Sequence, residues 1–335
     1  MNLKLFILGI GLSLCSYSLN AQNMVSMSSL HPETDTLSAN KKELAIRYPD
    51  LRQLGIDYDY FGYSDFDAKA DDNDFARGKI KTERIRTFFN SPAIRWKHNS
   101  LSASVYYTYT STELKNITNN LTDAQLAPLT AENNTFDLAL NYSRSDKIFN
   151  QPIIYSLIAR GISDGFHSFR RINFNGSFNL PIKKTENTSF SVGLLVLIDP
   201  SAPIPVEPII SYYHIFASSG IELIVDLPNG IDIKRKFAKN AWFSIGSNQH
   251  SYSTFYARHN AFLDSKVSYN TIELKNGAKF EYLFAKKVML FVSGGYNSFL
   301  SSRIFKDGER YHSASIKSNN KGVSYVNVGL SLLSF

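Results

Sequence analysis

The chain of 335 residues has 36 basic and 29 acidic side chains, a formal net charge of +7, 13% aromatic residues and one cysteine. The positive excess is spread along the chain in pairs of mixed sign, without a basic block, so nucleic-acid binding has no support. Cys15 falls within the expected leader, which excludes disulfide frameworks, thiolate nucleophiles and cysteine-ligated metals from the mature chain.

The first 21 residues have the pattern of a secretory signal peptide. Lys4 supplies the positive start, residues 5–14 the apolar stretch and Leu19-Asn20-Ala21 the cleavage site, so we expect the mature chain to begin at Gln22. The apolar stretch is too short to span a bilayer as a helix. Cys15 leaves a lipoprotein as the alternative, although the residue before it is Leu14 and not a small residue.

Residues 22–50 are rich in Ser, Asn and Lys with little periodicity, and we interpret them as an N-terminal periplasmic segment. From residue 51 to 335 the pattern has period two. On the first segment Leu54, Ile56, Tyr58 and Tyr60 alternate with polar residues, and long segments such as 101–109 and 171–180 alternate in the same way. This alternation predicts β-strands and fits no helix.

The predicted strands suit a membrane barrel, because a tilted strand needs about 9–11 residues to cross a bilayer. Short connections alternate with longer, polar ones, as turns and outer loops do in outer-membrane barrels. Taking residues 221–227 and 231–236 as two strands gives 14 in total. Merging them gives 13, and leaving that hairpin out of the wall gives 12. We therefore predict an all-β fold, an antiparallel up-and-down transmembrane barrel of about 14 strands. A soluble secreted β-sandwich is the alternative fold.

Most charged residues of the predicted strands fall on the face opposite the apolar one, so we expect them to line the lumen. Asp57 and Asp59 should face Arg84 and Arg86 of the next strand and form ion pairs with them. Such an interior allows two interpretations, a polar conduit or a plugged lumen whose charges satisfy each other. The remaining lumen candidates are Arg160, Arg171, Glu222, Asp226, Asp232, Lys234, Glu273, Lys275, Lys279 and Glu281.

Two features raise other chemistry. The loop from Asp65 to Asp74 gathers five carboxylates, but it lacks the spacing of an EF-hand, so a solvated outer loop is favoured over a calcium site. Three His-Ser dipeptides begin at His167, His250 and His312. Adjacent strand residues point to opposite faces, and no lipase or protease motif surrounds these dipeptides, so we expect no enzyme activity, no cofactor and no metal.

The chain ends on an amphipathic segment, residues 328–335, with the terminal aromatic Phe335. This end resembles the closing strand that the barrel assembly machinery recognises, although a bulge near Leu332 and Leu333 is needed to bring Phe335 into register. With the Asn20-Ala21-Gln22 junction, the whole mature chain resembles outer-membrane β-barrel proteins of unknown function from Bacteroidota.

That resemblance implies the bacterial outer membrane as the location, with membrane lipid and the barrel assembly machinery as partners. The expected role is a passive channel or porin-like transport of a small solute whose identity the sequence does not give. A non-conducting structural barrel and a barrel-embedded hydrolase are the alternatives.

Overall fold

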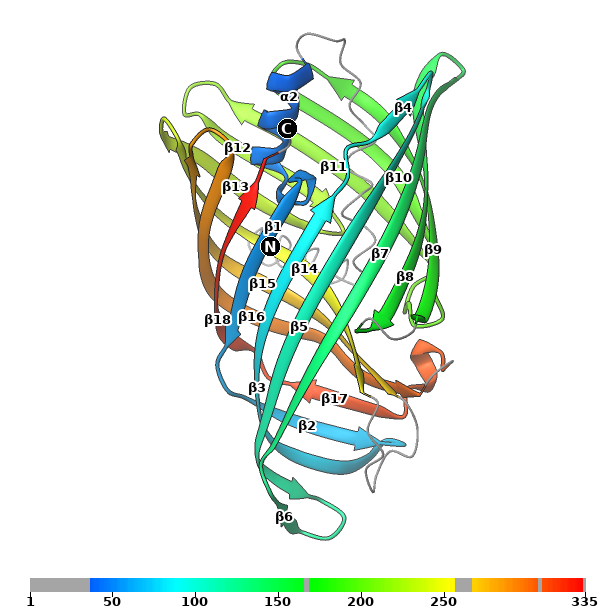
Figure 1. The fold of residues 1–335 in the computed structure, drawn as a ribbon, viewed down its shortest axis with the longest axis vertical. Helices are drawn as coiled ribbons and strands as arrows, with labels where there is room; N and C mark the ends of the chain where they lie inside the picture. Colours follow the sequence, from blue (N-terminus) through cyan, green and yellow to red (C-terminus); the bar gives the residue numbers. More distant parts are fainter. Residues whose placement is uncertain (1–36, 166–168, 257–266, 307–308, 334–335) are drawn as a thin grey trace, which may run out of the picture.

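The computed structural model describes residues 37–165, 169–256, 267–306 and 309–333. Eighteen antiparallel strands form one sheet, and β1 pairs with both β3 and β18, so the sheet closes on itself (Figure 1). Strands β2, β4, β6 and β17 lie outside this ring, which leaves fourteen wall strands in the described part of the chain. The prediction of an antiparallel barrel of about 14 strands is confirmed.

In ring order, the wall strands are β1 (Leu54–Phe61), β3 (Asn73–Asn90), β5 (Asn99–Asn119), β7 (Leu129–Ile148), β8 (Gln151–Asp164), β9 (Phe169–Lys184), β10 (Thr188–Ile198), β11 (Val206–Phe216), β12 (Ile221–Leu227), β13 (Gly230–Ala238), β14 (Ala241–Tyr256), β15 (Val267–Phe284), β16 (Val288–Lys306) and β18 (Val323–Leu332). The short hairpin of β12 and β13 belongs to the wall.

Alternation along the strands separates an apolar outer face from a polar inner one. On β1, Leu54 and Ile56 are exposed, whereas Asp57 and Asp59 are buried. On its neighbour β18, Val326, Val328 and Leu330 are exposed at the matching positions. Successive strand residues point to opposite faces, so this pattern coats the outside of the barrel with apolar side chains.

The two ends of the barrel differ in how far the strands extend (Figure 1). At one end the wall strands are joined by short turns, for example at residues 149–150 and 239–240. At the other end β2 (Ser64–Ala70) pairs with β17 (Ile316–Asn320), and together they extend β3 and β16 beyond β1 and β18. The strands β4 (Ile94–Trp96) and β6 (Ala124–Leu126) pair with β5 near its two ends.

The second half of β14 leaves the wall and crosses the lumen. Strand β13 pairs with β14 only as far as Asn248, and the rest of β14 pairs with β15 alone. Residues 249–256 reach β7 on the opposite side of the ring, where the Thr135 hydroxyl donates to the Ser253 carbonyl at 3.3 Å. On β15, Ser268 and Glu273 point to opposite faces of the strand, yet both are buried. Both faces of this part of β15 are therefore covered by protein. We call residues 249–256 and 267–275 the partition.

Glycines allow the bend that produces the partition. At Gly246 a Cβ atom would lie 2.6 Å from the Ile231 carbonyl oxygen, and at Gly277 it would lie 2.4 Å from the Gly294 carbonyl oxygen. A side chain at either position would collide with neighbouring backbone, so only glycine permits this close approach of the strands.

A short helical segment lies against the inner wall at the end with short turns. It consists of α2 (Leu37–Arg47) and the 3₁₀ turn η2 (Pro49–Leu51), and we call residues 37–51 the plug. Ala45 packs in an apolar cluster with Trp242, Leu283, Met289 and Leu333. Among the described residues, no helix has the length and hydropathy required to cross a bilayer.

The end of the chain differs from the sequence-based expectation. Strand β18 keeps a regular register with β1 and with β16 as far as Leu332, so the predicted bulge does not occur within this strand. Leu333 is instead buried beneath the plug, which gives it a packing role that the alternation could not show. Phe335 and the signal peptide lie outside the described residues.

Candidate functional site

Four buried charges form a layer across the lumen. Asp59 of β1, Arg84 of β3, and Glu273 and Lys275 of β15 are all at most 6% exposed. Arg84 lies 3.0 Å from Glu273 and 3.7 Å from Asp59, and Lys275 lies 2.7 Å from Asp59. Strands β16 and β18 separate β15 from β1 in the ring, so these contacts cross the lumen. We call the four side chains the charge layer. It has two charges of each sign.

A second ion pair borders the charge layer. Arg86 donates to Asp57 at 2.9 Å through Nε, and Asn327 donates to the same carboxylate at 3.0 Å. Arg86 also donates to the Tyr252 hydroxyl, and the Arg84 guanidinium lies 3.5 Å from the centre of the Tyr252 ring. The structure therefore brings the predicted charges of β1 and β3 together, and it adds Tyr252, which the sequence did not single out.

Two further predicted lumen charges, Arg160 and Arg171, lie on the neighbouring strands β8 and β9. Arg160 pairs with Asp137 on the neighbouring strand β7, and its Nε donates at 2.7 Å. Arg171 of β9 donates to Ser201 at 2.8 Å and to Ser268 of the partition at 3.1 Å. The sequence analysis did not include Asp137 among the lumen charges, although it alternates with Phe136 and Leu138 on a predicted strand.

The plug is held by one carboxylate and two cations. Glu281, 1% exposed, accepts from Arg52 and from Lys234, both at 2.6 Å. The same two cations donate to the last turn of α2, Arg52 to the Ala45 carbonyl at 3.0 Å and Lys234 to the Ile46 carbonyl at 2.6 Å. Cations at a helix C-terminus satisfy its unpaired carbonyls. We call Glu281, Arg52 and Lys234 the latch.

Other lumen candidates also meet the plug. Arg47 at the end of α2 lies 3.5 Å from Glu222 and stacks 3.5 Å from the centre of the Tyr213 ring. Asp226 accepts from Asn229 at 2.9 Å. Asp50 on the 3₁₀ turn is exposed to the lumen, and desolvation by the surrounding barrel wall raises its pKa.

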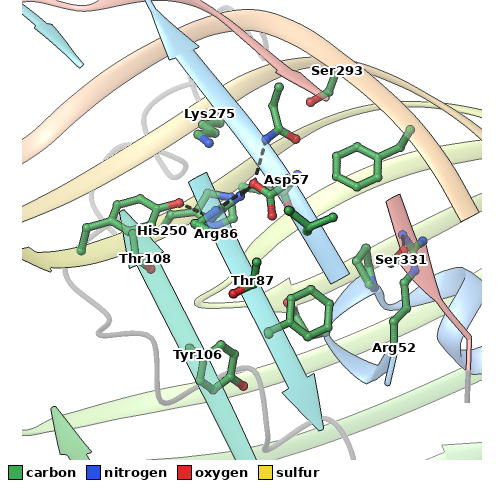
Figure 2. A pocket seen from close by; sticks show the side chains of 18 of the residues that line it. Arg52, Asp57, Arg86, Thr87, Tyr106, Thr108, His250, Lys275, Ser293 and Ser331 are labelled. Carbon is green, nitrogen blue, oxygen red and sulfur yellow. Dashed lines mark hydrogen bonds and ion pairs between the residues drawn. The ribbon is translucent and has the colours of Figure 1, made fainter. Parts of the chain in front are cut away.

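Between the plug and the charge layer lies a chamber of about 270 Å³. Pro49, Asp50 and Arg52 form its plug side, and Asp57, Arg86 and Lys275 lie on the opposite side. Figure 2 shows Arg86 at the centre, with Asp57 and His250 beside it and Tyr106 and Thr108 on the adjoining strand. Lys279, Asp232 and Tyr325 also line the chamber. A concave space on which a few polar groups converge is the usual form of a small-molecule site.

The acidic loop is paired with lysines. Asp65 lies 3.2 Å from Lys321, Asp72 lies 2.7 Å from Lys317, and Asp74 lies 3.4 Å from Lys69. The hydrogen bond and positive charge of Lys317 lower the pKa of Asp72. In the described parts of the chain, no three potential ligands are grouped closely enough to hold a metal ion. The loop is mainly strand β2 and its turn.

The His-Ser dipeptides offer no base–nucleophile pair in the described residues. His250 lines the chamber, while Ser251 is buried on the opposite face of β14. Ser313 donates to the Arg310 carbonyl within a 3₁₀ turn, beside His312. The dipeptide at His167 lies outside the described residues.

No protein-family model matches the chain, and no curated protein matches its sequence. In structure it is similar to an outer-membrane channel from Pseudomonas putida F1, with 9% identity and a TM-score of 0.34 over 84% of this chain and 96% of that one. It is also similar to the P. putida toluene transporter TodX, with 12% identity and a TM-score of 0.33 over 92% and 95% of the chains. The Escherichia coli outer-membrane protease OmpT gives 8% identity and a TM-score of 0.26 over 83% and 96%. The closed antiparallel sheet itself shows the barrel fold.

Proposed function

We propose that this protein is a transport barrel of the bacterial outer membrane whose lumen is closed in the conformation described here. The chamber between the plug and the charge layer carries this proposal, because it is a solute-sized space inside a barrel with an apolar outer face. A permanently open porin would leave its lumen charges hydrated, whereas Asp59 and Glu273 are buried against their partners. Passage of a solute therefore requires the plug or the charge layer to move.

Planar bilayer recordings test the proposal. The wild-type protein should be silent for most of the time, with brief openings. Glu281→Gln should increase the open time strongly, because it leaves Arg52 and Lys234 without the carboxylate that holds them beside the plug. Glu83→Gln is the matched control, since Glu83 pairs with Lys81 on the outer surface.

The recordings also distinguish the alternatives. A large, stable wild-type conductance would identify an open porin and overturn the closed state. Silence in both the wild type and Glu281→Gln would favour a non-conducting structural barrel, which the buried charge layer also fits.

The outer-membrane location is part of the proposal. Exposed apolar side chains such as Ile56, Val328 and Ile245 need a lipid surface, because water disfavours so continuous an apolar face. The protein should fractionate with the outer membrane and require detergent for extraction. Removal of Phe335 should reduce assembly without blocking export, as its proposed recognition by the barrel assembly machinery implies. Recovery of the protein from soluble periplasm would contradict this location.

A further inference from the structure

We infer that the chamber binds a small zwitterion, a short peptide the size of a dipeptide with both ends free. This inference rests on the proposed function and names the class of solute. Most of the ionisable groups that line the chamber already have partners. The satisfied pairs are Arg86 with Asp57, Arg160 with Asp137, Lys275 with Asp59 and Arg52 with Glu281.

Two lining charges of opposite sign have no such partner. Lys279 of β15 and Asp232 of β13 are half-buried, and neither forms an ion pair within 4 Å in the described part of the chain. Asp232 accepts one hydrogen bond, from the Asn248 amide at 3.2 Å. Asp50 of the plug lines the same chamber and is within the electrostatic influence of Lys279, although the two form no ion pair within 4 Å in the described residues. A charge in a confined space is costly without a counter-charge, so a ligand that supplies both signs gains most there.

The register sets the spacing of these two charges. Asp232 pairs with Gly246, and Gly246 pairs with Gly277, so two strand spacings, roughly 10 Å, separate Asp232 from β15. Lys279 follows Gly277 by two residues on the same strand and points to the same face. An extended dipeptide spans roughly 7 Å. With a contact of about 3 Å at each end, its ammonium can reach Asp232 while its carboxylate reaches Lys279.

The floor between the two charges suits a peptide backbone. Gly246 and Gly277 contribute backbone without side chains, so the Asp232 carboxylate lies close over Gly246, and a Cβ at Gly277 would lie 2.8 Å from the Tyr325 hydroxyl oxygen. Tyr325 and His250 line the chamber and offer polar atoms near the middle of a bound ligand. A simple anion would leave Asp232 unmet and a simple cation would leave Lys279 unmet, so the site discriminates against both.

Calorimetry on the full-length mature protein in detergent tests the inference, with L-alanyl-L-alanine as the probe. The matched probes are the same dipeptide acetylated and amidated at its ends, which carries no charge, acetate as an anion, and a neutral disaccharide. We expect binding of the free dipeptide only. Lys279→Met and Asp232→Asn should each weaken it at least about tenfold, as loss of a charged hydrogen bond does. Lys183→Met is the control, because Lys183 is exposed near the end of β9.

The inference is overturned if the blocked dipeptide binds as tightly as the free one, or if only acetate or the disaccharide binds. It is also overturned if no probe binds, or if the two chamber variants bind like the wild type. Uptake of labelled dipeptide by proteoliposomes separates this result from the proposed function. Binding of the dipeptide without uptake would support the ligand class and contradict transport. Uptake of other solutes without dipeptide binding would support transport and contradict the ligand class.

Discussion

Replacement of Arg84 by methionine should strongly destabilise the barrel, because it removes one charge from a neutral, buried group of four. Glu273 loses its partner at 3.0 Å, whereas Asp59 keeps Lys275 at 2.7 Å and Arg86 at 3.6 Å. Removal of one member of a buried pair costs about 3–5 kcal/mol, since the remaining charge stays buried. A cost of about 4 kcal/mol lowers the folding equilibrium constant roughly a thousandfold.

The double variant Arg84→Met, Glu273→Met tests the origin of this cost. It restores neutrality and leaves the Lys275–Asp59 pair at 2.7 Å, so it should be clearly more stable than either single variant. Urea titration in detergent micelles, followed by tryptophan fluorescence and by the gel shift of the folded barrel, measures all four forms. Glu83→Gln on the outer surface should change stability by less than about 1 kcal/mol. A cost below about 1 kcal/mol for Arg84→Met would refute the reasoning, because it would mean that the charge layer is hydrated.

Three further outcomes are expected. Glu281→Gln should expose the plug to trypsin after Arg47, and unchanged cleavage would show that the latch does not hold the plug. Because the pKa of Asp50 is raised when the plug is docked, the neutral carboxyl favours the docked plug. This stabilisation is complete at a pH below the ordinary carboxyl pKa, and it is lost as the pH rises through the raised pKa of Asp50. Asp50→Asn should therefore protect the plug from a protease at neutral pH and have no effect near pH 3, and equal protection at both values would contradict this sign. Gly277→Val should impair assembly by collision with the Gly294 carbonyl, and a fully folded variant in heat-modifiability gels would show that the bend tolerates a side chain.

The sequence predicted the wall well because one physical rule governs it. A strand between lipid and lumen must alternate, and this requirement marks both the strands and their faces. It was sufficient to place Asp57 and Asp59 on the same face as Arg84 and Arg86 of the neighbouring strand. The register adds that Asp57 lies opposite Arg86 and Asp59 opposite Arg84. The sequence left the β12–β13 hairpin open, as two wall strands, as one merged strand or as a hairpin outside the wall, and the structure has two wall strands.

The interior was harder to predict, because its contacts join residues far apart in the chain. Arg52 meets Glu281 only after the barrel has closed, and no local pattern connects them. The partition did leave a signal. The outward positions of β14 change from Phe243 and Ile245 to Ser247 and then to Ser251, which a strand in contact with lipid would not do. The low periodicity of residues 22–50 predicts a periplasmic segment and does not predict the helix α2 that packs within the barrel.

The short β12–β13 hairpin has a consequence for the surrounding membrane. Strand β12 has seven residues, so at about 3.3 Å per residue and a tilt near 40° it covers only about 18 Å of the membrane normal. The apolar band of a barrel is about 25 Å tall, and the neighbouring half of β14 has turned into the lumen. In the proposed outer-membrane location, lipid on this side would meet a lower hydrophobic wall, and the bilayer would thin against it. Hydrophobic mismatch would then be greatest on the β12–β13 side of the barrel. Neighbouring proteins or lipids with shorter chains would therefore gather on this side.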